Sequence, residues 1–185
     1  MRDSKQDILN FWFVESSPDQ WFTYDPTYDD EIAERFTLTY TMACEGLGDA
    51  WSQSADGALA LCLLFDQIPR HIFHGTPRMF ATDTEALAVA KYAIKRGFDQ
   101  GLPHEQRFFL YLPFEHSEKP ADQKRSLELF EGIADHNPRA AHVARQRYDT
   151  FARFGRFPER NAILRRPSTK EELAYLKTIT SPSKL

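Results

Sequence analysis

Cysteine is scarce in this sequence, and long apolar runs are missing. Only 2 of the 185 residues are cysteine, and neither belongs to a CxxC pair, so the sequence argues against a disulfide framework. Cys44 and Cys62 each fall within a helical apolar pattern, which predicts reduced thiols in the core. No segment approaches the ~18 apolar residues needed to cross a bilayer. The N-terminal "MRDSKQDILNFWF" also lacks a cleavable apolar stretch. We therefore expect a cytoplasmic protein without membrane contact.

The common sequence signatures of catalytic and cofactor sites are also missing. The chain has no nucleophile elbow, Walker loop, dinucleotide fingerprint or HExxH zinc pair, so we expect no cofactor. The pair His71 and His74 has helical i, i+3 spacing, but Pro69 and Gly75 bracket it closely. We therefore predict no metal site. The other residues that could supply ligands are His116, His136, Asp66 and Asp83.

Charge is distributed unevenly along the chain. The net charge is -4, yet residues 1–66 hold 13 acidic and 3 basic residues, whereas residues 139–166 hold 8 arginines against Asp149 and Glu159. Opposite blocks of this kind either neutralise each other within the fold or leave an anion site in the arginine-rich part. Extended nucleic-acid binding needs many uncompensated cations, so we expect no nucleic-acid partner.

Apolar residues recur at helical spacing along the chain, and capping residues mark where helices begin. Thr27 is the predicted N-cap of the second helix. Thr82 and Glu85 form a predicted capping box for "TDTEALAVAKYAIKRG". Pro138 opens the helix "PRAAHVARQRYDTFARFG", and Ser168 caps "STKEELAYLKTI".

The segment "ALALCLLF", within residues 54–67, is apolar on every side, which is typical of a central element. A buried strand is the alternative, but alanine and leucine dominate and β-branched residues are absent, so we predict a helix. We expect a break at Pro69. Taken together, the patterns predict an all-α fold in which residues 1–185 form a single domain of antiparallel helix pairs. They leave open whether the pairs form a bundle or a short solenoid.

Three long motifs carry a family resemblance. They are "LLFDQIPRHIFHGTPRMFATD" (63–83), "LPFEHSEKPADQ" (112–123) and "RFGRFPERNAIL" (153–164), and in this order and spacing the sequence resembles the bacterial DUF924 family. The opening "ILNFWF" and the closing "STKEELAYL" match as well. The resemblance implies a tetratricopeptide-like (TPR-like) all-α fold and no established activity, cofactor or catalytic residue. The sequence departs from the family's usual pattern at His71, His74, Glu159 and Arg165.

Asp66 directly follows the apolar run, near the predicted end of its helix, where the helix dipole disfavours a negative charge. A carboxylate buried there needs a cation, and a guanidinium group can meet it with two hydrogen bonds. Arg70 and the arginines of residues 153–160 are the candidates. One interpretation is a structural clamp that fixes a helix corner, and the other is part of a functional site.

The stretch "EHSE" at residues 115–118 combines an imidazole, a hydroxyl and carboxylates at the predicted start of a helix. His116 could act as a general acid or base together with Glu118 or Asp66. The structural alternative is that Ser117 caps the helix, Glu118 complements its dipole and His116 fills a gap.

The stretch "RFGRFPERN" interleaves arginine with phenylalanine. Arg153, Arg156 and Arg160 are spaced as on a helix, but Gly155 and Pro158 argue against a continuous one. We therefore expect a turn, anchored by its phenylalanines, that directs the arginines toward carboxylates elsewhere in the fold or into a cleft.

Three functions remain open. The first, which we favour, is binding of a small anionic or carboxylate-bearing ligand in a pocket. The second is a hydrolase or transferase that uses His116 with Glu118 or Asp66. The third is a protein-interaction module of TPR-like type with a protein partner, an analogy of fold alone. The ligand-binding residues predicted for the first function are Arg70, His116, Arg153, Arg156 and Arg160.

Overall fold

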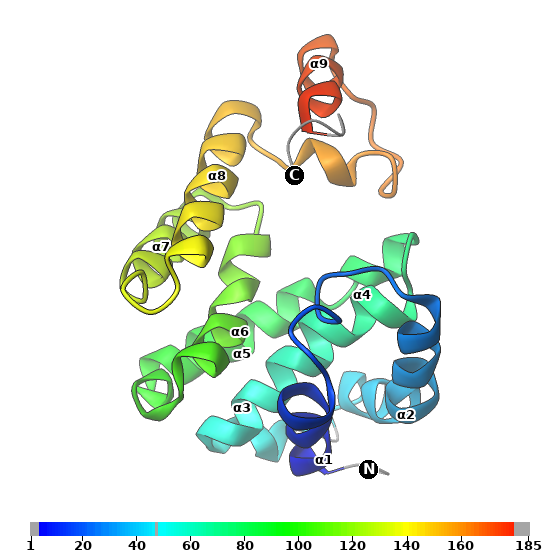
Figure 1. The fold of residues 1–185 in the computed structure, drawn as a ribbon, viewed down its shortest axis with the longest axis vertical. Coiled ribbons are helices and arrows are strands. Elements are labelled where there is room, and N and C mark those ends of the chain that lie inside the picture. The colour runs from blue at the N-terminus through cyan, green and yellow to red at the C-terminus, as the bar shows by residue number, and fades with distance from the viewer. Residues whose placement is uncertain (1–3, 47, 180–185) are drawn as a thin grey trace.

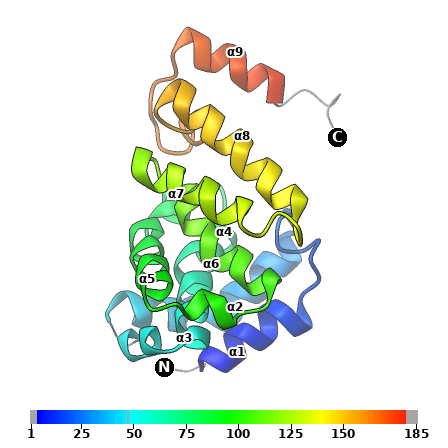
Figure 2. The same ribbon diagram turned by 90° about the vertical axis from the view of Figure 1, so that its left-hand side faces the viewer.

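The computed structural model describes residues 4–46 and 48–179, and that part of the chain is helical without a β-strand. The all-α prediction is thus confirmed. Figures 1 and 2 show the helices stacked along one long axis, with α1 near one end and α9 at the other. The α-helices are α1 (Lys5–Asn10), α2 (Pro26–Cys44), α3 (Ala55–Cys62), α4 (Ile68–Ile72), α5 (Asp83–Lys95), α6 (His104–His116), α7 (Pro120–Glu131), α8 (Pro138–Phe154) and α9 (Lys170–Ile179).

Short helical turns connect these helices. Two of them are π-helical, and the others are 3₁₀ turns. They are η1 (Phe11–Glu15), η2 (Asp49–Gln53), η3 (Leu63–Gln67), η4 (Pro77–Phe80), η5 (Phe98–Gly101) and η6 (Pro158–Arg160). The second π-helical turn, η3, joins α3 to α4 without a break.

The apolar helix α3 lies at the centre of the fold, as its sequence predicts. It packs against α1, α5 and α6, while α5, α6 and α7 each contact the next helix along the chain. Its side chains from Ala58 to Cys62 are all buried. Large aromatic side chains complete the core around it, with Trp12, Phe36 and Phe109 at most 1% exposed. Burying each such side chain stabilises the fold by roughly 1.5–3 kcal/mol.

The predicted helix break at Pro69 is wrong, because a π-helical turn accommodates the proline. Pro69 has no N–H, and its ring clashes with the carbonyl four residues earlier in a regular α-helix. In η3 the chain widens, and the N–H of Ile68 donates to the carbonyl of Leu63. The carbonyl of Phe65 instead accepts a hydrogen bond from Thr82 Oγ1 at 2.7 Å. Thr82 therefore makes no side-chain cap on α5, which corrects the predicted capping box.

Two other helix starts differ by one or two residues from their predicted caps. Asp25, not Thr27, caps α2, because its carboxylate accepts from the N–H of Thr27. At α9 the N–H of Glu172 donates to Thr169 Oγ1, and the N–H of Thr169 donates to the Glu172 carboxylate, so the box lies one residue after Ser168. In both cases a side chain one or two residues from the predicted cap accepts the hydrogen bond from the first turn of the helix.

The two cysteines occupy different environments. Cys62 is buried, as predicted, whereas Cys44 is exposed, and both are free thiols. Within residues 4–46 and 48–179, every helix is too short or too polar to cross a membrane.

Candidate functional site

Asp66 lies in the π-helical turn η3 and is completely buried. Its carboxylate is 2.7 Å from Nδ1 of His116 and 3.3 Å from Nη2 of Arg70. The side-chain amide of Gln67 donates to its other oxygen. π-Helical turns occur frequently at functional sites. Here the wider turn coincides with a carboxylate that binds two basic side chains.

Burial and neighbouring charges fix the ionisation of this pair. Burial alone would raise the pKa of Asp66, but the Arg70 charge and the hydrogen bonds from His116 and Gln67 hold that pKa well below its usual value. Burial lowers the pKa of His116 to about 4, and the charge of Arg70 acts in the same direction. At neutral pH the pair is therefore an ionised Asp66 and a neutral His116.

Asp83, at the start of α5, links two arginines from distant segments. Its carboxylate accepts from Arg70 Nη2 at 2.9 Å and from Arg160 Nη1 at 3.2 Å. Burial, together with the nearby Asp66 charge, raises the pKa of Asp83 to about 6 despite both arginines. Asp66, Arg70, Asp83 and Arg160 thus form one chain of ion pairs that joins η3 and α4 to η6.

The last turn of α6 carries Glu115 and His116 side by side. Gln123 of α7 donates from its side-chain amide to the carbonyls of Phe114, Glu115 and Ser117, at 3.2, 2.8 and 2.7 Å. These bonds satisfy the free carbonyls at the helix end and fix its position. Glu115 is only 6% exposed, and burial raises its pKa to about 7.

The stretch "RFGRFPERN" forms the predicted turn. Helix α8 ends at Phe154, and Gly155 follows in the left-handed conformation with a φ of 68°. Phe157 is fully buried. The guanidinium carbons of Arg147 and Arg160 lie 3.7 and 5.2 Å from the centre of its ring. The turn therefore holds two guanidinium groups against one aromatic side chain.

The guanidinium of Arg147 is only partly satisfied. It forms an ion pair with Glu159 through Nη1. Its Nε is buried and has no hydrogen-bond partner among the described residues; Oε1 of Glu115 lies 3.9 Å from it, beyond hydrogen-bond distance. A buried, unpaired N–H costs roughly 1–3 kcal/mol. Arg160 uses one of its five N–H groups on Asp83.

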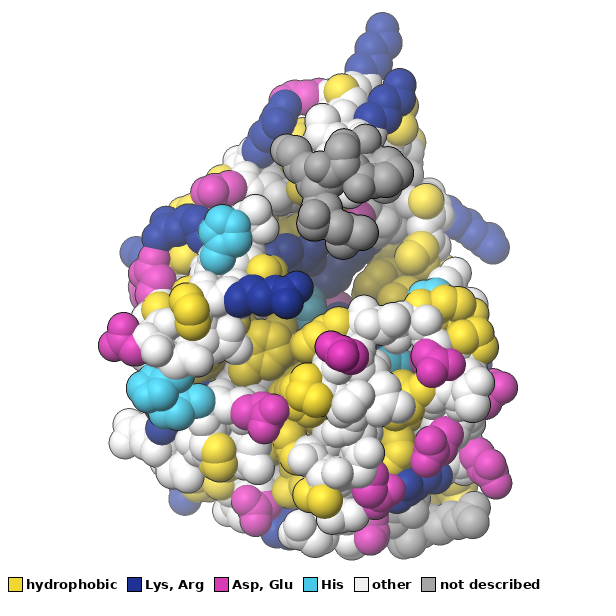
Figure 3. Space-filling view, in the orientation of Figure 1, with side chains coloured by type: hydrophobic (Ala, Val, Ile, Leu, Met, Phe, Trp, Pro, Cys, Tyr) yellow, Lys and Arg dark blue, Asp and Glu magenta, His cyan; other side chains and the backbone are white. Residues whose placement is uncertain are grey.

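These groups surround a pocket of about 450 Å³ that is open to solvent. It lies between the α4–η4 segment and the end of α6 on one side, and α8 and η6 on the other. Figure 3 shows a recess between the C-terminal helices and the rest of the molecule, with Lys or Arg side chains in its depth. The pocket is lined by Arg70, Met79, Phe80, Glu115, His116, Val143, Arg147, Glu159, Arg160 and Ile163.

The structure brings three of the five predicted ligand-binding residues together. Arg70, His116 and Arg160 line the pocket. Asp66, a candidate catalytic residue, lies behind His116 and contacts it directly. The three motifs of the sequence therefore converge on a cavity that solvent can reach.

Arg153 and Arg156 lie away from this pocket. Arg153 donates to Glu171 at 2.7 and 2.9 Å, and Arg156 donates to both carboxylate oxygens of Glu172 at 2.7 and 2.8 Å. Arg156 also donates to the carbonyl of Pro167 at 2.8 Å. Both arginines attach the C-terminal segment to the end of α8.

Glu118, the other candidate acid, is also placed outside the pocket. Its carboxylate accepts from the N–H of Phe157 at 2.8 Å and from Arg166 at 2.5 and 3.0 Å. Ser117 is not the cap of α7, because its hydroxyl donates to Asp122 at 2.8 Å. Glu118 therefore joins the α6–α7 connection to the turn that carries Arg160.

We expect Glu172→Gln to loosen α9. Glu172 is 2% exposed, and the hydrogen bonds from Arg156 lower its pKa to about 2, so its stabilising effect is present above about pH 4.5 and is lost as the pH falls toward 2. Hydrogen exchange at pH 7, followed by mass spectrometry over residues 170–179, should become faster. Glu171→Gln is the matched control, because its pair with Arg153 is exposed. Equal exchange in the two variants would contradict the anchoring role of Glu172.

Sequence reasoning missed Arg147 as a member of the site. Helix α8 carries several arginines, and their spacing does not tell which of them faces the pocket. Ala140 and Ala144 mark the buried face of the helix, and Arg147 lies one turn after the lining residue Val143, but only the structure shows that this face meets the pocket.

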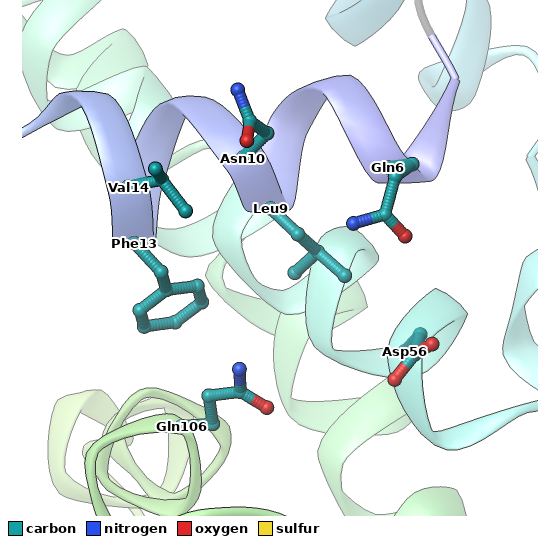
Figure 4. Close-up of a pocket in the computed structure, with 7 residues that line it drawn as sticks. All are labelled: Gln6, Leu9, Asn10, Phe13, Val14, Asp56 and Gln106. Carbon is teal, nitrogen blue, oxygen red and sulfur yellow. The ribbon is translucent and has the colours of Figure 1, made fainter.

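A second hollow, of about 170 Å³, lies beside α1 and η1. Figure 4 shows Leu9 and Phe13 pointing from α1 and η1 into this hollow, with Gln106 and Asp56 on its opposite side. Its described lining residues carry amide and apolar side chains, and Asp56 is the only ionisable one among them. It therefore lacks the acid–base and cationic groups that distinguish the larger pocket.

The histidines named as possible metal ligands are separated in space. His71 Nδ1 lies 2.7 Å from Asp29, His74 stacks on Tyr24 and His136 stacks on His104. Among the described residues, no three His, Cys, Asp or Glu side chains are grouped so that they could hold a metal ion.

Comparisons with known proteins identify relatives of this chain. The family model described as "Bacterial protein of unknown function (DUF924)" matches residues 8–179. A solved structure, that of the protein of unknown function ATU0120 from Agrobacterium tumefaciens, is 41% identical, with a TM-score of 0.89, over 94% of this chain and 97% of that one. No curated protein matches the sequence.

Proposed function

This chain belongs to the DUF924 family of bacterial proteins, and we propose that its arginine-lined pocket binds a small molecule bearing a carboxylate or phosphate group. The observation that carries the proposal is the pair of guanidinium groups, Arg147 and Arg160, which are held against Phe157 and line the pocket. An anion in the pocket would accept hydrogen bonds from these groups and offset the repulsion of two like charges.

The rest of the pocket suits a small organic molecule. A volume of about 450 Å³ falls within the range of small-molecule sites, which combine apolar walls with a few polar groups. Met79, Phe80, Val143 and Ile163 supply the apolar part. The imidazole of His116 offers a hydrogen-bond acceptor, because Nδ1 is used by Asp66.

Carboxylates limit how much anionic charge the pocket accepts. Arg70 is bound by two carboxylates, Asp66 and Asp83, so it adds little to an anion site. Among the described residues, Arg147 and Arg160 each have one carboxylate within hydrogen-bond distance. Glu115, with a pKa of about 7, adds a negative charge to the pocket in alkaline solution. We therefore expect anion binding to weaken as the pH rises above 7.

We expect Arg147→Gln to weaken binding of inorganic phosphate and succinate by roughly 10-fold or more, which corresponds to the loss of a charge-assisted hydrogen bond. Isothermal titration calorimetry measures this loss. Arg153→Gln is the matched control, since it removes the same charge outside the pocket. Equal weakening in both variants would show that binding is a general charge effect, and no binding to the unmodified protein would contradict the proposal.

A second candidate function, hydrolysis or group transfer, is favoured by the contact between His116 and Asp66 at 2.7 Å. A buried carboxylate that orients an imidazole recurs in enzymes that use histidine chemically. The TPR-like interpretation of the fold, the protein-interaction module, the cytoplasmic location and the absence of a nucleic-acid partner remain predictions from the sequence.

A further inference from the structure

His116 is presented to the pocket in one defined orientation. Its Nδ1 lies 2.7 Å from the ionised Asp66, so Nδ1 carries the proton and donates it, and Nε2 carries the lone pair. Asp66 itself is buried behind the ring. The ring edge with Nε2 is therefore the edge left for the pocket that His116 lines.

The low basicity of His116 argues against a role as general base and leaves a role as nucleophile. With a pKa of about 4, the imidazole is a weak general base at neutral pH, because a base works best when its pKa is near the working pH. Its lone pair is nevertheless free over the whole neutral range. Nucleophilic attack requires the neutral imidazole, which is the form that His116 has at neutral pH, although low basicity also lowers the reactivity of the lone pair.

Glu115 has the complementary property. It lines the same pocket, next to His116 in the chain, and its pKa of about 7 lets it give and take a proton near neutrality. Among the described lining residues no serine, threonine or cysteine is present, and the carboxylate of Glu159 is paired with Arg147. With Glu115 assigned to proton transfer, the imidazole is the nucleophile that we assign. Arg147 and Arg160 would hold the oxygens of a transferring phosphoryl group.

We propose that this pocket is the active site of a phosphomonoester hydrolase, in which His116 accepts the phosphoryl group on Nε2 and Glu115 protonates the leaving alcohol. This inference rests on the anion site proposed above, and it adds the substrate class and the reaction. Phosphate esters fit both arginines, because three equatorial oxygens can accept hydrogen bonds at once.

The reaction proceeds in two balanced steps. In the first, the Nε2 lone pair attacks phosphorus, the P–O bond to the alcohol breaks with its electrons on the leaving oxygen, and the Glu115 carboxyl group donates its proton to that oxygen. In the second, water attacks phosphorus, the P–N bond breaks with its electrons returning to Nε2, and the Glu115 carboxylate takes the water proton. The sum is ester plus water to alcohol plus inorganic phosphate.

Asp66 has a defined part in these steps as a positioning residue. When Nε2 bears the phosphoryl group and Nδ1 keeps its proton, the ring is cationic. The ionised carboxylate of Asp66, 2.7 Å from Nδ1, stabilises that cation and keeps the ring oriented. Arg70 holds Asp66 ionised, so it acts through Asp66.

The test uses the full chain with two phosphoryl donors, acetyl phosphate and 4-nitrophenyl phosphate. We expect release of 4-nitrophenolate and, after brief mixing with acetyl phosphate, a phosphohistidine that peptide mass spectrometry locates at His116. The variant His116→Asn keeps a side-chain N–H that can reach Asp66 but has no Nε2. Its turnover should fall by roughly 10³-fold or more, with the phosphohistidine absent and folding confirmed by circular dichroism.

A control variant and a variant of the proposed acid separate this inference from the proposed function. Arg153→Gln should turn over 4-nitrophenyl phosphate like the unmodified protein, because Arg153 lies outside the pocket. Glu115→Gln should slow alcohol release and remove the pH dependence of turnover near 7. If inorganic phosphate binds but neither turnover nor phosphohistidine is seen, the hydrolase inference falls and the binding site stands. If phosphate does not bind at all, both fall.

Discussion

Replacing Asp66 with alanine is expected to lower the free energy of unfolding by about 3–5 kcal/mol, which is typical when one partner of a buried ion pair is removed. Asp66 is 0% exposed, and Arg70, His116 and Gln67 all bind its carboxylate. Without the carboxylate, Asp83 is the one carboxylate left to pair with Arg70 in this network, and His116 and Gln67 lose their hydrogen-bond partner. The helical turn that carries Asp66 would then keep its apolar packing through Leu63 and Leu64 but lose its ion pair and its contact with His116.

Urea denaturation followed by circular dichroism at pH 7 measures this loss. Asp56→Ala is the matched control, because Asp56 is an exposed aspartate on the preceding helix α3. Its effect should stay within about 1 kcal/mol, the range of a helix-dipole interaction. A loss below 1 kcal/mol for Asp66→Ala would show that the network around Asp66 does not hold the fold together.

Replacing Glu115 with glutamine is expected to stabilise the protein by about 3 kcal/mol at pH 8, from a pKa shift of 4.5 to about 7. Between these two pH values the folded state binds more protons at Glu115 than the unfolded state does, so this residue makes the wild-type protein less stable as the pH rises. Above pH 7 the full penalty of a buried carboxylate remains. Glutamine cannot ionise, and the gain should disappear toward pH 4.5.

Urea denaturation at several pH values between 4.5 and 8 checks the sign of this effect. Glu118→Gln is the matched control, and its expected effect on the free energy of unfolding has the opposite sign. The pKa of Glu118 is lowered by its hydrogen bonds with Arg166 and the N–H of Phe157 in spite of partial burial, so its stabilising effect is present above pH 4.5. Its replacement should therefore destabilise the protein at pH 8. A Glu115→Gln variant that is no more stable than wild type at pH 8 would contradict the burial of an ionised group.

The residues of the site differ in how far the sequence could place them. Asp66 was predicted to be buried and paired with an arginine because a charge follows an apolar helix directly, and both features are observed. The turn at Gly155 was also predicted, since glycine adopts a positive φ without strain. These are local properties that the chain encodes within a few residues.

The partners of the arginines depend on long-range packing. Arg153 and Arg156 were predicted to share the ligand site with Arg160, yet α9 folds back against α8 and supplies Glu171 and Glu172. The separation of residues along the sequence does not predict which carboxylate pairs with Arg153 or Arg156 in the folded protein. Arg147 was missed for the same reason, because the rotation of α8 about its axis decides which arginine meets the pocket.

The π-helical turn shows a different limit. Pro69 predicts a helix break from local chemistry alone. The break is avoided because Thr82, which is distant in the chain, binds the carbonyl of Phe65 that the proline leaves without a donor. Thr82, which the sequence predicts as the cap of α5, therefore binds the turn η3 instead.

The central claim is that Arg147 and Arg160 together bind an anion. The most direct measurement is a titration of the ¹⁵N-labelled protein with inorganic phosphate, followed by NMR through the Nε–Hε signals of the arginines. The claim predicts that the signals of Arg147 and Arg160 shift together on one saturating curve, while those of Arg153 and Arg156, which are held by carboxylates of the C-terminal segment, stay in place. An unchanged Arg147 signal at saturating phosphate, or equal shifts of all four arginines, would contradict it.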